Sequence, residues 1–529
     1  MLLVNRTFFF RYSSPLRALV TFSVVAYLFY LVSTLSGYVS QTPAPRERPA
    51  IIQMKEEKWK QQHGQDVPAG LSVQILTVTT TFVEVQTKTR TVQAPQATVT
   101  KEVMIKPKPK QLLRGLPTES FQDNLLPEVQ YVTSWTGSGF TNDVMTFVSD
   151  FPFPVDFSLI HLKINLIYLG LLTQRVPVLP HFAPTHVAVN LGGTHTGPGI
   201  DFGEVFDIPR YVELTSQPLL EWWQIKDRKS TTLDPLGCWN VWESVSPMNK
   251  GPHWTESPYR LNLDVSYVTA PSWIKHAPED PENLHTRFAA LMSLGFPTRR
   301  NKSLMAASES PQPDDHMLCF DNMYWACDLE PHDMVEDWSA SWRLVGQYLH
   351  WTPKIEGLAD MYLRHAFGIS SRTPIPPFIA IHVRRGDFAD AWRCENAPTE
   401  ECFAPISAYA RRVNAMKREI LETKGITVKH AMLLSDEEDE NWWRQAMGTY
   451  GPEGWARANH VELETAKMYG AWYPILIDAA IQSHRMSMGI VGTHTSTVSI
   501  LAGKRIGSWN NGAPVQFVKW GRWGPDDGM

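Results

Sequence analysis

Strand and helix signals alternate regularly through the second half of the chain, and this alternation restricts the fold more than any other feature. The run PPFIAIHV (376–383) predicts a buried strand, and ISAYARRVNAMKREILETKG (406–425) predicts an amphipathic helix that ends at Gly425. Strand, helix, helix and strand–turn–helix signals follow at 428–437, 439–447, 469–483 and 488–503. Such an order favours a parallel sheet covered by helices on both faces.

The first half carries a weaker version of the same pattern. VQYVTSW (129–135) predicts a strand, the apolar segment 157–174 a buried helix, and VPVLPHF (176–182) a second strand. We therefore expect an α/β protein with two Rossmann-like domains, over 126–355 and 356–520, that face a cleft. In open α/β sheets, ligands bind at the carboxyl ends of the strands.

The N-terminal region has a different composition. Residues 18–39 form a run of 22 residues without a charge, which is long enough to cross a bilayer as a signal-anchor helix. Three arginines precede this run, so the positive-inside rule predicts that residues 1–17 are cytosolic and that the rest is lumenal. A cleaved signal peptide is the alternative. The Pro- and Thr-rich segment 40–125 is predicted to be a stem.

Cysteines and a sequon agree with a lumenal location. A lumenal domain can hold one or two disulfides beside an odd thiol, and five cysteines fit that arrangement. Two pairs are close enough in sequence to close short loops, Cys394 with Cys402 and Cys319 with Cys327. Asn301 begins a sequon for N-glycosylation.

Charge and one motif indicate how an anion would be bound. The net charge is −5 and no long basic run is present, which argues against nucleic-acid binding. HVRRGDF (382–388) directly follows the first predicted strand of the second half. Arginine offers a planar, permanently charged fork for a diphosphate, Gly386 allows a tight turn, and Asp387 could hold one arginine in place. The alternative is a structural Arg–Asp pair at a strand end.

Two further strand ends carry polar residues. Ser435-Asp436-Glu437 ends a predicted strand, where a carboxylate can accept hydrogen bonds from a base or ribose; the alternative is a helix N-cap. GTHTSTVS (492–499) lies between a strand and a helix, where hydroxyls and backbone N–H groups can bind a phosphate. Simple helix capping is again the alternative.

Together these motifs resemble a known family. Arg384 in HVRRGDF, the acidic SDE segment and GTHTSTVSILAGKR (492–505), in this order, resemble the C-terminal-domain motifs of GDP-fucose fucosyltransferases, the superfamily of the protein O-fucosyltransferases and the α1,2- and α1,6-fucosyltransferases. WRCENAPTEECFAPIS (392–407) resembles the fungal branch. The likeness covers 126–520 and is clearest over 350–520. It implies a GT-B fold, transfer of fucose with inversion, no metal and no cofactor, a protein or glycan acceptor, and residence in the Golgi or ER membrane.

The resemblance also implies roles for individual residues. Arg384 matches the arginine that contacts the β-phosphate and assists departure of GDP. Asp436 matches an acidic residue near the nucleoside, and Ser496 and Thr497 match hydroxyls at the diphosphate. The full set of implied donor-binding residues is Gly139, Asn142, His382, Arg384, Asp436, Ser496 and Thr497.

The general base has no clear match. The first-domain loop lacks the glutamate that some protein O-fucosyltransferases carry, and Asp143 is the only acid nearby. Glu204 and Asp207 are other candidates, for which structural roles are the alternative. The competing functions are therefore a transferase for another GDP-sugar, an inactive Golgi protein that binds nucleotide or glycan, and a structural cell-surface protein.

Overall fold

The structure of the protein is a computed structural model. It describes residues 92–94, 97–99, 111–135, 162–183, 199–245, 250–295, 313, 316–386, 402–521 and 526. The chain divides into two compact units, Met1–Pro107 and Lys108–Met529. In the first unit, β1 (Val92–Ala94) pairs antiparallel with β2 (Ala97–Val99). All further description concerns the second unit.

The first sheet has six strands in the order β5-β4-β3-β9-β6-β7, and every pairing is parallel. The strands are β3 (Tyr131–Ser134), β4 (Val176–Leu179), β5 (Leu220–Glu221), β6 (Asp234–Asn240), β7 (Leu263–Thr269) and β9 (Met317–Phe320). A small parallel pair joins β8 (Thr286–Arg287) to β10 (Ala326–Cys327). The helices of this half are α3 (Phe121–Asn124), α5 (Leu162–Thr173), α6 (Phe202–Val205), α7 (Ile208–Thr215), α8 (Trp222–Ile225), α9 (Trp242–Val245), α10 (Ser257–Arg260), α11 (Phe288–Leu294) and α12 (Ala340–Leu344).

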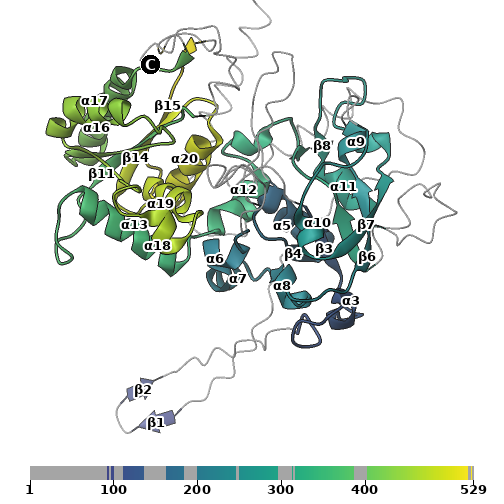
Figure 1. Cartoon of the computed structure of the whole chain (residues 1–529). Coiled ribbons are helices and arrows are strands. Elements are labelled where there is room, and N and C mark those ends of the chain that lie inside the picture. The colour runs from purple at the N-terminus through teal and green to yellow at the C-terminus, as the bar shows by residue number, and fades with distance from the viewer. Residues whose placement is uncertain are drawn as a thin grey trace, which may run out of the picture. The chain divides into compact units, whose positions relative to one another are not determined.

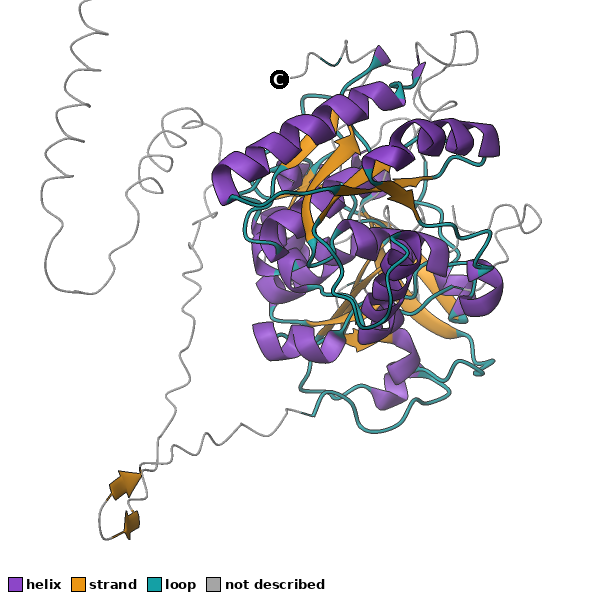
Figure 2. Ribbon diagram, turned by 90° about the vertical axis from the view of Figure 1, so that its left-hand side faces the viewer, coloured by secondary structure: helices purple, strands orange, loops and turns teal. Residues whose placement is uncertain are grey.

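The second sheet has five parallel strands in the order β13-β12-β11-β14-β15. They are β11 (Phe378–Val383), β12 (His430–Ser435), β13 (Trp455–Arg457), β14 (Ser487–Thr493) and β15 (Val515–Val518). The helices are α13 (Pro353–Ala366), α16 (Ile406–Lys424), α17 (Glu440–Tyr450), α18 (Thr465–Tyr469), α19 (Tyr473–Gln482) and α20 (Thr497–Trp509). Figure 1 colours the elements of this sheet green to yellow and those of the first sheet blue to teal, and Figure 2 shows helices packed alongside the strands of both sheets.

Side-chain alternation along β11 explains why this strand is almost entirely apolar. Phe378 and Ala380 belong to a core that also contains α13, α19 and the inner face of the first sheet. Ile379 and Ile381 point the other way, into a second core formed with α16 and α17. A central strand covered on both faces has no solvent side, so every position except His382, near its carboxyl end, is apolar.

The two halves are joined by polar and cationic contacts of aromatic side chains. The Trp342 indole donates to Ser508 Oγ at 2.9 Å, and the Trp509 indole donates to the Gln347 carbonyl at 2.7 Å. The guanidinium of Arg505, which is buried, lies 4.1 Å from the ring centroid of Trp351. These contacts connect α20 of the second half with residues 342–351.

The prediction of an α/β protein with parallel sheets is confirmed. The predicted strand and helix segments of the second half correspond to β11, α16, β12, α17, α19, β14 and α20, and those of the first half to β3, α5 and β4. Gly425 follows α16 with a left-handed φ of 66°, as a C-terminal glycine should. The division at 355/356 and the GT-B assignment stay predictions.

The predicted stem is too long at its C-terminal end. Phe121 and Leu125 are buried, and the Phe121 ring packs edge-on against Trp222 at 5.4 Å. Residues 111–125 thus pack against the first sheet, although a four-residue helix is too short to show a periodic signal. The segment 18–39 lies outside the described residues. Within the described part of the chain, no helix has the length and apolar character needed to cross a membrane.

The proposed pairing of Cys319 with Cys327 is wrong. Cys319 forms a disulfide with Cys238, 81 residues away, and Cys327 is a buried free thiol. The reason is sheet topology: Cys238 lies on β6 and Cys319 on β9, which are neighbouring strands. Cys402 is disulfide-bonded, and its predicted partner Cys394 lies outside the described residues, as does Asn301.

Candidate active site

Three strand ends of the second sheet meet at one edge. β11 is the central strand and pairs with β12 and β14, with Val383 opposite Ser435 and His382 opposite Gly492. The residues that follow each strand therefore lie side by side, as parallel pairing requires. This edge brings together the segments that start at Arg384, Asp436 and His494.

Arg384 is held by the end of β12. Its Nη1 donates to Asp436 Oδ2 at 2.5 Å, in an ion pair whose side chains keep 23% and 27% exposure. Asp436 Oδ1 also accepts from the backbone N–H of Arg385 at 2.7 Å. Gly386 has φ 22°, and a Cβ there would lie 2.5 Å from Asp436 Oδ2, so only glycine allows this approach. Asp436 thereby fixes a charged guanidinium at the sheet edge.

Arg385 has a different environment. Its Nε donates to Glu437 in an ion pair, and its guanidinium stacks over the rings of Phe403 at 4.6 Å and Trp442 at 5.3 Å. Cation–π stacking of this kind packs the side chain into the fold. Arg385 is thus packed between aromatic rings of the second half.

The N-cap alternative for the SDE segment is wrong, because α17 starts after Asp439, which accepts from the Asn441 N–H.

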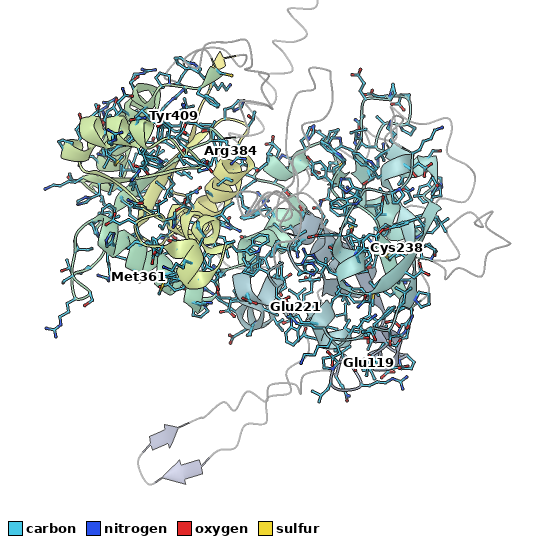
Figure 3. All side chains as sticks on the ribbon, in the orientation of Figure 1. Glu119, Glu221, Cys238, Met361, Arg384 and Tyr409 are labelled. Atoms are coloured by element: carbon cyan, nitrogen blue, oxygen red, sulfur yellow. A yellow bond between two sulfur atoms is a disulfide. The ribbon has the colours of Figure 1, made fainter. Side chains whose placement is uncertain are left out.

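The hydroxyl of Thr493 joins three elements at this edge. Its Oγ1 lies 2.8 Å from the Arg384 N–H, 3.1 Å from the His382 carbonyl and 2.7 Å from the Tyr409 hydroxyl. His382 belongs to β11, Arg384 follows the end of that strand and Tyr409 belongs to α16, while Thr493 ends β14. Figure 3 shows Arg384 and Tyr409 in the half that contains this sheet, with Cys238 and Glu221 in the other.

His382 is a structural histidine at the same edge. Its Nδ1 shares a hydrogen bond of 2.8 Å with Ser499 Oγ, which also accepts from the Thr493 N–H at 3.0 Å. Burial, with a contribution from the charge of Arg384, lowers the pKa of His382 to about 3, so the imidazole is neutral near pH 7. Gly492 lets Ser499 approach, since a Cβ there would lie 2.5 Å from the Ser499 Cβ.

The turn between β14 and α20 forms a helix N-terminus beside Thr493. Thr495 takes a left-handed φ of 66°, and Ser496 occupies the N-cap position of the 13-residue helix α20 without a side-chain capping bond. Ser496 is 1% exposed, and its Oγ has no hydrogen-bond partner among the described residues. A buried hydroxyl without a partner, at the positive end of a helix, suits an anionic ligand.

A large cavity adjoins this turn. It measures about 780 Å³ and is lined by His494 and Thr495, by the α20 face that carries Lys504, and by Arg343 of the first half. Burial lowers the pKa of Lys504 to about 8. The volume falls within the range for small-molecule sites, and its walls include two cationic side chains.

The remaining predicted site residues divide into two groups. Gly139, Asn142, Asp143 and Asp387 lie outside the described residues. Glu204 is exposed on α6, and Asp207 caps α7 by accepting from the Arg210 N–H at 3.0 Å. Asp207 therefore has the structural role. In the described ranges, no group of three or more His, Cys, Asp or Glu side chains could hold a metal ion.

Sequence reasoning missed Thr493 and Tyr409. Thr493 lay within the GTHTST motif but was given no role, although its position as the last strand residue is a usable signal. Tyr409 lies in α16 and shows only as one apolar position of that helix. Its contact with the strand end depends on how α16 packs on the sheet, which no sequence motif encodes.

Comparison with known proteins gives a likeness of fold. No protein-family model and no curated protein sequence matches the chain. Solved structures do match at 13–14% identity. Structures of POFUT1, a GDP-fucose protein O-fucosyltransferase, are among them. The complex with GDP-fucose has 13% identity and a TM-score of 0.45, covering 73% of this chain and 98% of the other. The complex with GDP has 14% identity and a TM-score of 0.43, covering 74% and 98%. Identities and TM-scores at these levels concern the fold and do not bear on catalysis.

Proposed function

We propose that the protein is a glycosyltransferase that transfers fucose from GDP-fucose. One observation carries the proposal. The Arg384 guanidinium, which Asp436 fixes, follows the end of β11, and the neighbouring strand β14 leads into the N-terminus of α20. The buried Ser496 hydroxyl lies at that helix terminus and has no hydrogen-bond partner among the described residues. A cation, a helix terminus and a hydroxyl together are what a diphosphate requires.

The proposed chemistry follows from charge. An acceptor hydroxyl attacks C1 of fucose while the bond from C1 to the β-phosphate oxygen breaks, and GDP departs with the bonding electron pair. Negative charge grows on the β-phosphate as this bond lengthens. Arg384 stabilises that charge, and the N–H groups and dipole of α20 assist at the diphosphate. The acceptor proton must pass to a base, for which Asp143 and Glu204 remain candidates. Inversion at C1 and independence from metal are part of the proposal.

The proposal includes a place in the cell. The uncharged run 18–39, the arginines before it and the lumenal sequon support a type II protein of the Golgi or ER membrane. In sealed microsomes, the portion after residue 40 should be protected from added protease. A secreted form trimmed near residue 40 would indicate a signal peptide instead.

Calorimetry on the full-length protein in detergent tests the donor. We expect GDP and GDP-fucose to bind, GDP-mannose to bind more weakly, and UDP-sugars to give no heat. Binding should persist in EDTA. Recognition of UDP but not GDP would contradict the proposal, and loss of binding in EDTA would contradict its metal-free form. Binding of GDP without release of GDP from GDP-fucose would favour the alternative of an inactive nucleotide-binding protein.

A further inference from the structure

The Thr493 hydroxyl makes three hydrogen bonds whose directions follow from chemistry. The backbone N–H of Arg384 can only donate, and the His382 carbonyl can only accept. The Thr493 hydroxyl has a single hydrogen, which it therefore donates to the His382 carbonyl. The remaining partner, Tyr409, must therefore donate its own hydrogen to Thr493 Oγ1. All the hydrogen-bonding capacity of the Thr493 hydroxyl is used.

Burial makes this arrangement rigid. Thr493 is 4% exposed and Tyr409 is 1% exposed. Burial also raises the pKa of Tyr409, so the phenol keeps its proton across the neutral range and remains a donor. Hydrogen bonds in such a setting are strong, and a lost partner is costly because water cannot replace it.

We propose that Thr493 and Tyr409 are positioning residues that set the backbone of Arg384 and hence the contact of its guanidinium with the β-phosphate. This inference rests on the proposed function. Asp436 holds the side chain of Arg384 at one end, and Thr493 holds its backbone at the other. With both ends fixed, the guanidinium has a defined place before the donor arrives. Such preorganisation matters because a shift of about 1 Å at a charged contact can cost two orders of magnitude in rate.

Comparison of GDP with GMP isolates the β-phosphate contact in a binding measurement. Wild type should prefer GDP over GMP, and Arg384→Ala should lose that preference. Thr493→Val, which removes the hydroxyl but keeps the shape, should reduce the preference about tenfold, the value of one good hydrogen bond. Tyr409→Phe should reduce it less. Thr493→Ser, which restores the hydroxyl, should recover most of it. The affinity for GMP should stay constant.

A matched pair elsewhere in the same half provides the control. Tyr362 of α13 and Thr465 of α18 are equally buried, and their hydroxyls also share a hydrogen bond. This pair bonds neither Arg384 nor a residue of the GTHTST turn. Thr465→Val and Tyr362→Phe should lower the melting temperature as much as the site variants do, while the preference for GDP stays within about twofold of wild type.

A double-mutant cycle shows whether Thr493 acts through Arg384. In the Arg384→Ala background, Thr493→Val should change the preference for GDP no further. An equal loss in both backgrounds, or a wild-type preference in Thr493→Val, would overturn the inference. If Thr493→Val does not fold, Tyr409→Phe carries the same test. Wild-type protein that binds GDP and GMP equally would refute the proposed role of Arg384 itself, a failure that is visible before any Thr493 variant is made.

Discussion

An aspartate follows a parallel strand in each half of the molecule, and the two have opposite surroundings. Asp321 follows β9 of the first sheet, is fully buried, and accepts from the backbone N–H groups of Val241 at 2.7 Å and His253 at 3.1 Å. Asp436 follows β12 of the second sheet, is partly exposed, and pairs with Arg384. One carboxylate ties loops together, whereas the other holds a cation where a ligand can reach it.

The difference shows what makes a strand end a site. The position of the residue is the same, and so is its chemistry, but burial raises the pKa of Asp321 to about 7 against the opposing effect of its N–H donors. Asp436 keeps solvent access beside the arginine that it pairs with. A strand end is open to a ligand when its charged groups remain in contact with solvent, as at Asp436, and is closed to one when they are buried, as at Asp321.

Removing the disulfide of the first sheet should give the largest effect on stability. Replacing both Cys238 and Cys319 with alanine frees a loop of 81 residues and should lower the free energy of unfolding by about 4 kcal/mol. The affinity of the folded protein for GDP should not change. Urea titration followed by tryptophan fluorescence measures the first quantity and calorimetry the second. Cys327→Ala is the control and should cost about 1 kcal/mol; equal losses would contradict the distinction.

Arg384→Ala should reverse this pattern, with a large effect on turnover and a small one on stability. Loss of a contact that strengthens in the transition state should lower kcat for GDP release about a hundredfold, or about 3 kcal/mol. Arg384→Lys should rescue little, because an ammonium lacks the bidentate fork. Arg457 of β13, which forms an ion pair with Glu440 of α17, is the matched control. If Arg385→Ala loses activity at an unchanged melting temperature while Arg384→Ala retains it, the two arginines have exchanged roles.

Asp321→Ala should destabilise the protein by about 2 kcal/mol, because it leaves several buried N–H groups without an acceptor. Asp321→Asn should cost less. Asp436→Ala should change stability little and should weaken GDP binding instead, because Arg384 loses its carboxylate. Thermal unfolding and calorimetry on the same samples measure both effects. Equal stability losses for the two aspartates would remove the contrast between the sheets.

His382 should make the protein sensitive to acid, with an effect that is small near neutral pH and grows as the pH falls. Its folded pKa of about 3 lies below the ordinary value near 6.5, so below pH 6.5 the unfolded chain takes up a proton that the folded protein does not. Stability then falls as pH decreases from 6.5 toward 3, by at most about 1.4 kcal/mol per pH unit. His382→Asn should flatten the curve over this window. An unchanged slope in urea titrations at pH 4 to 7 would show that His382 is not responsible.

The three central strands of the second sheet could be predicted from sequence, whereas β13, β15 and most of the first sheet could not. β11 and α16 were predicted because a strand covered on both faces is almost entirely apolar, and because apolar residues recur along an amphipathic helix at a clear spacing. β6 reads DPLGCWN, with a proline, a glycine and an aspartate, and gives no such signal. Its place beside β9 depends on long-range pairing, which also decided the partner of Cys319.

The candidate site was predictable to a similar degree. Arg384 and Asp436 were singled out because each directly follows a strand, and Ser496 because it lies in the turn between β14 and α20. The partner of Arg384 was not, since Asp436 is 52 positions away along the chain and Asp387 is closer in sequence. Spacing identifies residues at a strand end, but pairing between strand ends follows only from the order of strands in the sheet.

The cation–π contact of Arg505 has a kinetic consequence. Attraction between a guanidinium and an aromatic ring is appreciable only within about 6 Å of the ring centroid, so the two halves can separate only after Arg505 has left Trp351. The contact therefore favours halves that already lie together before the donor binds. We therefore expect donor association to be a single phase whose observed rate rises linearly with donor concentration, without the plateau that a slow conformational step before binding would impose.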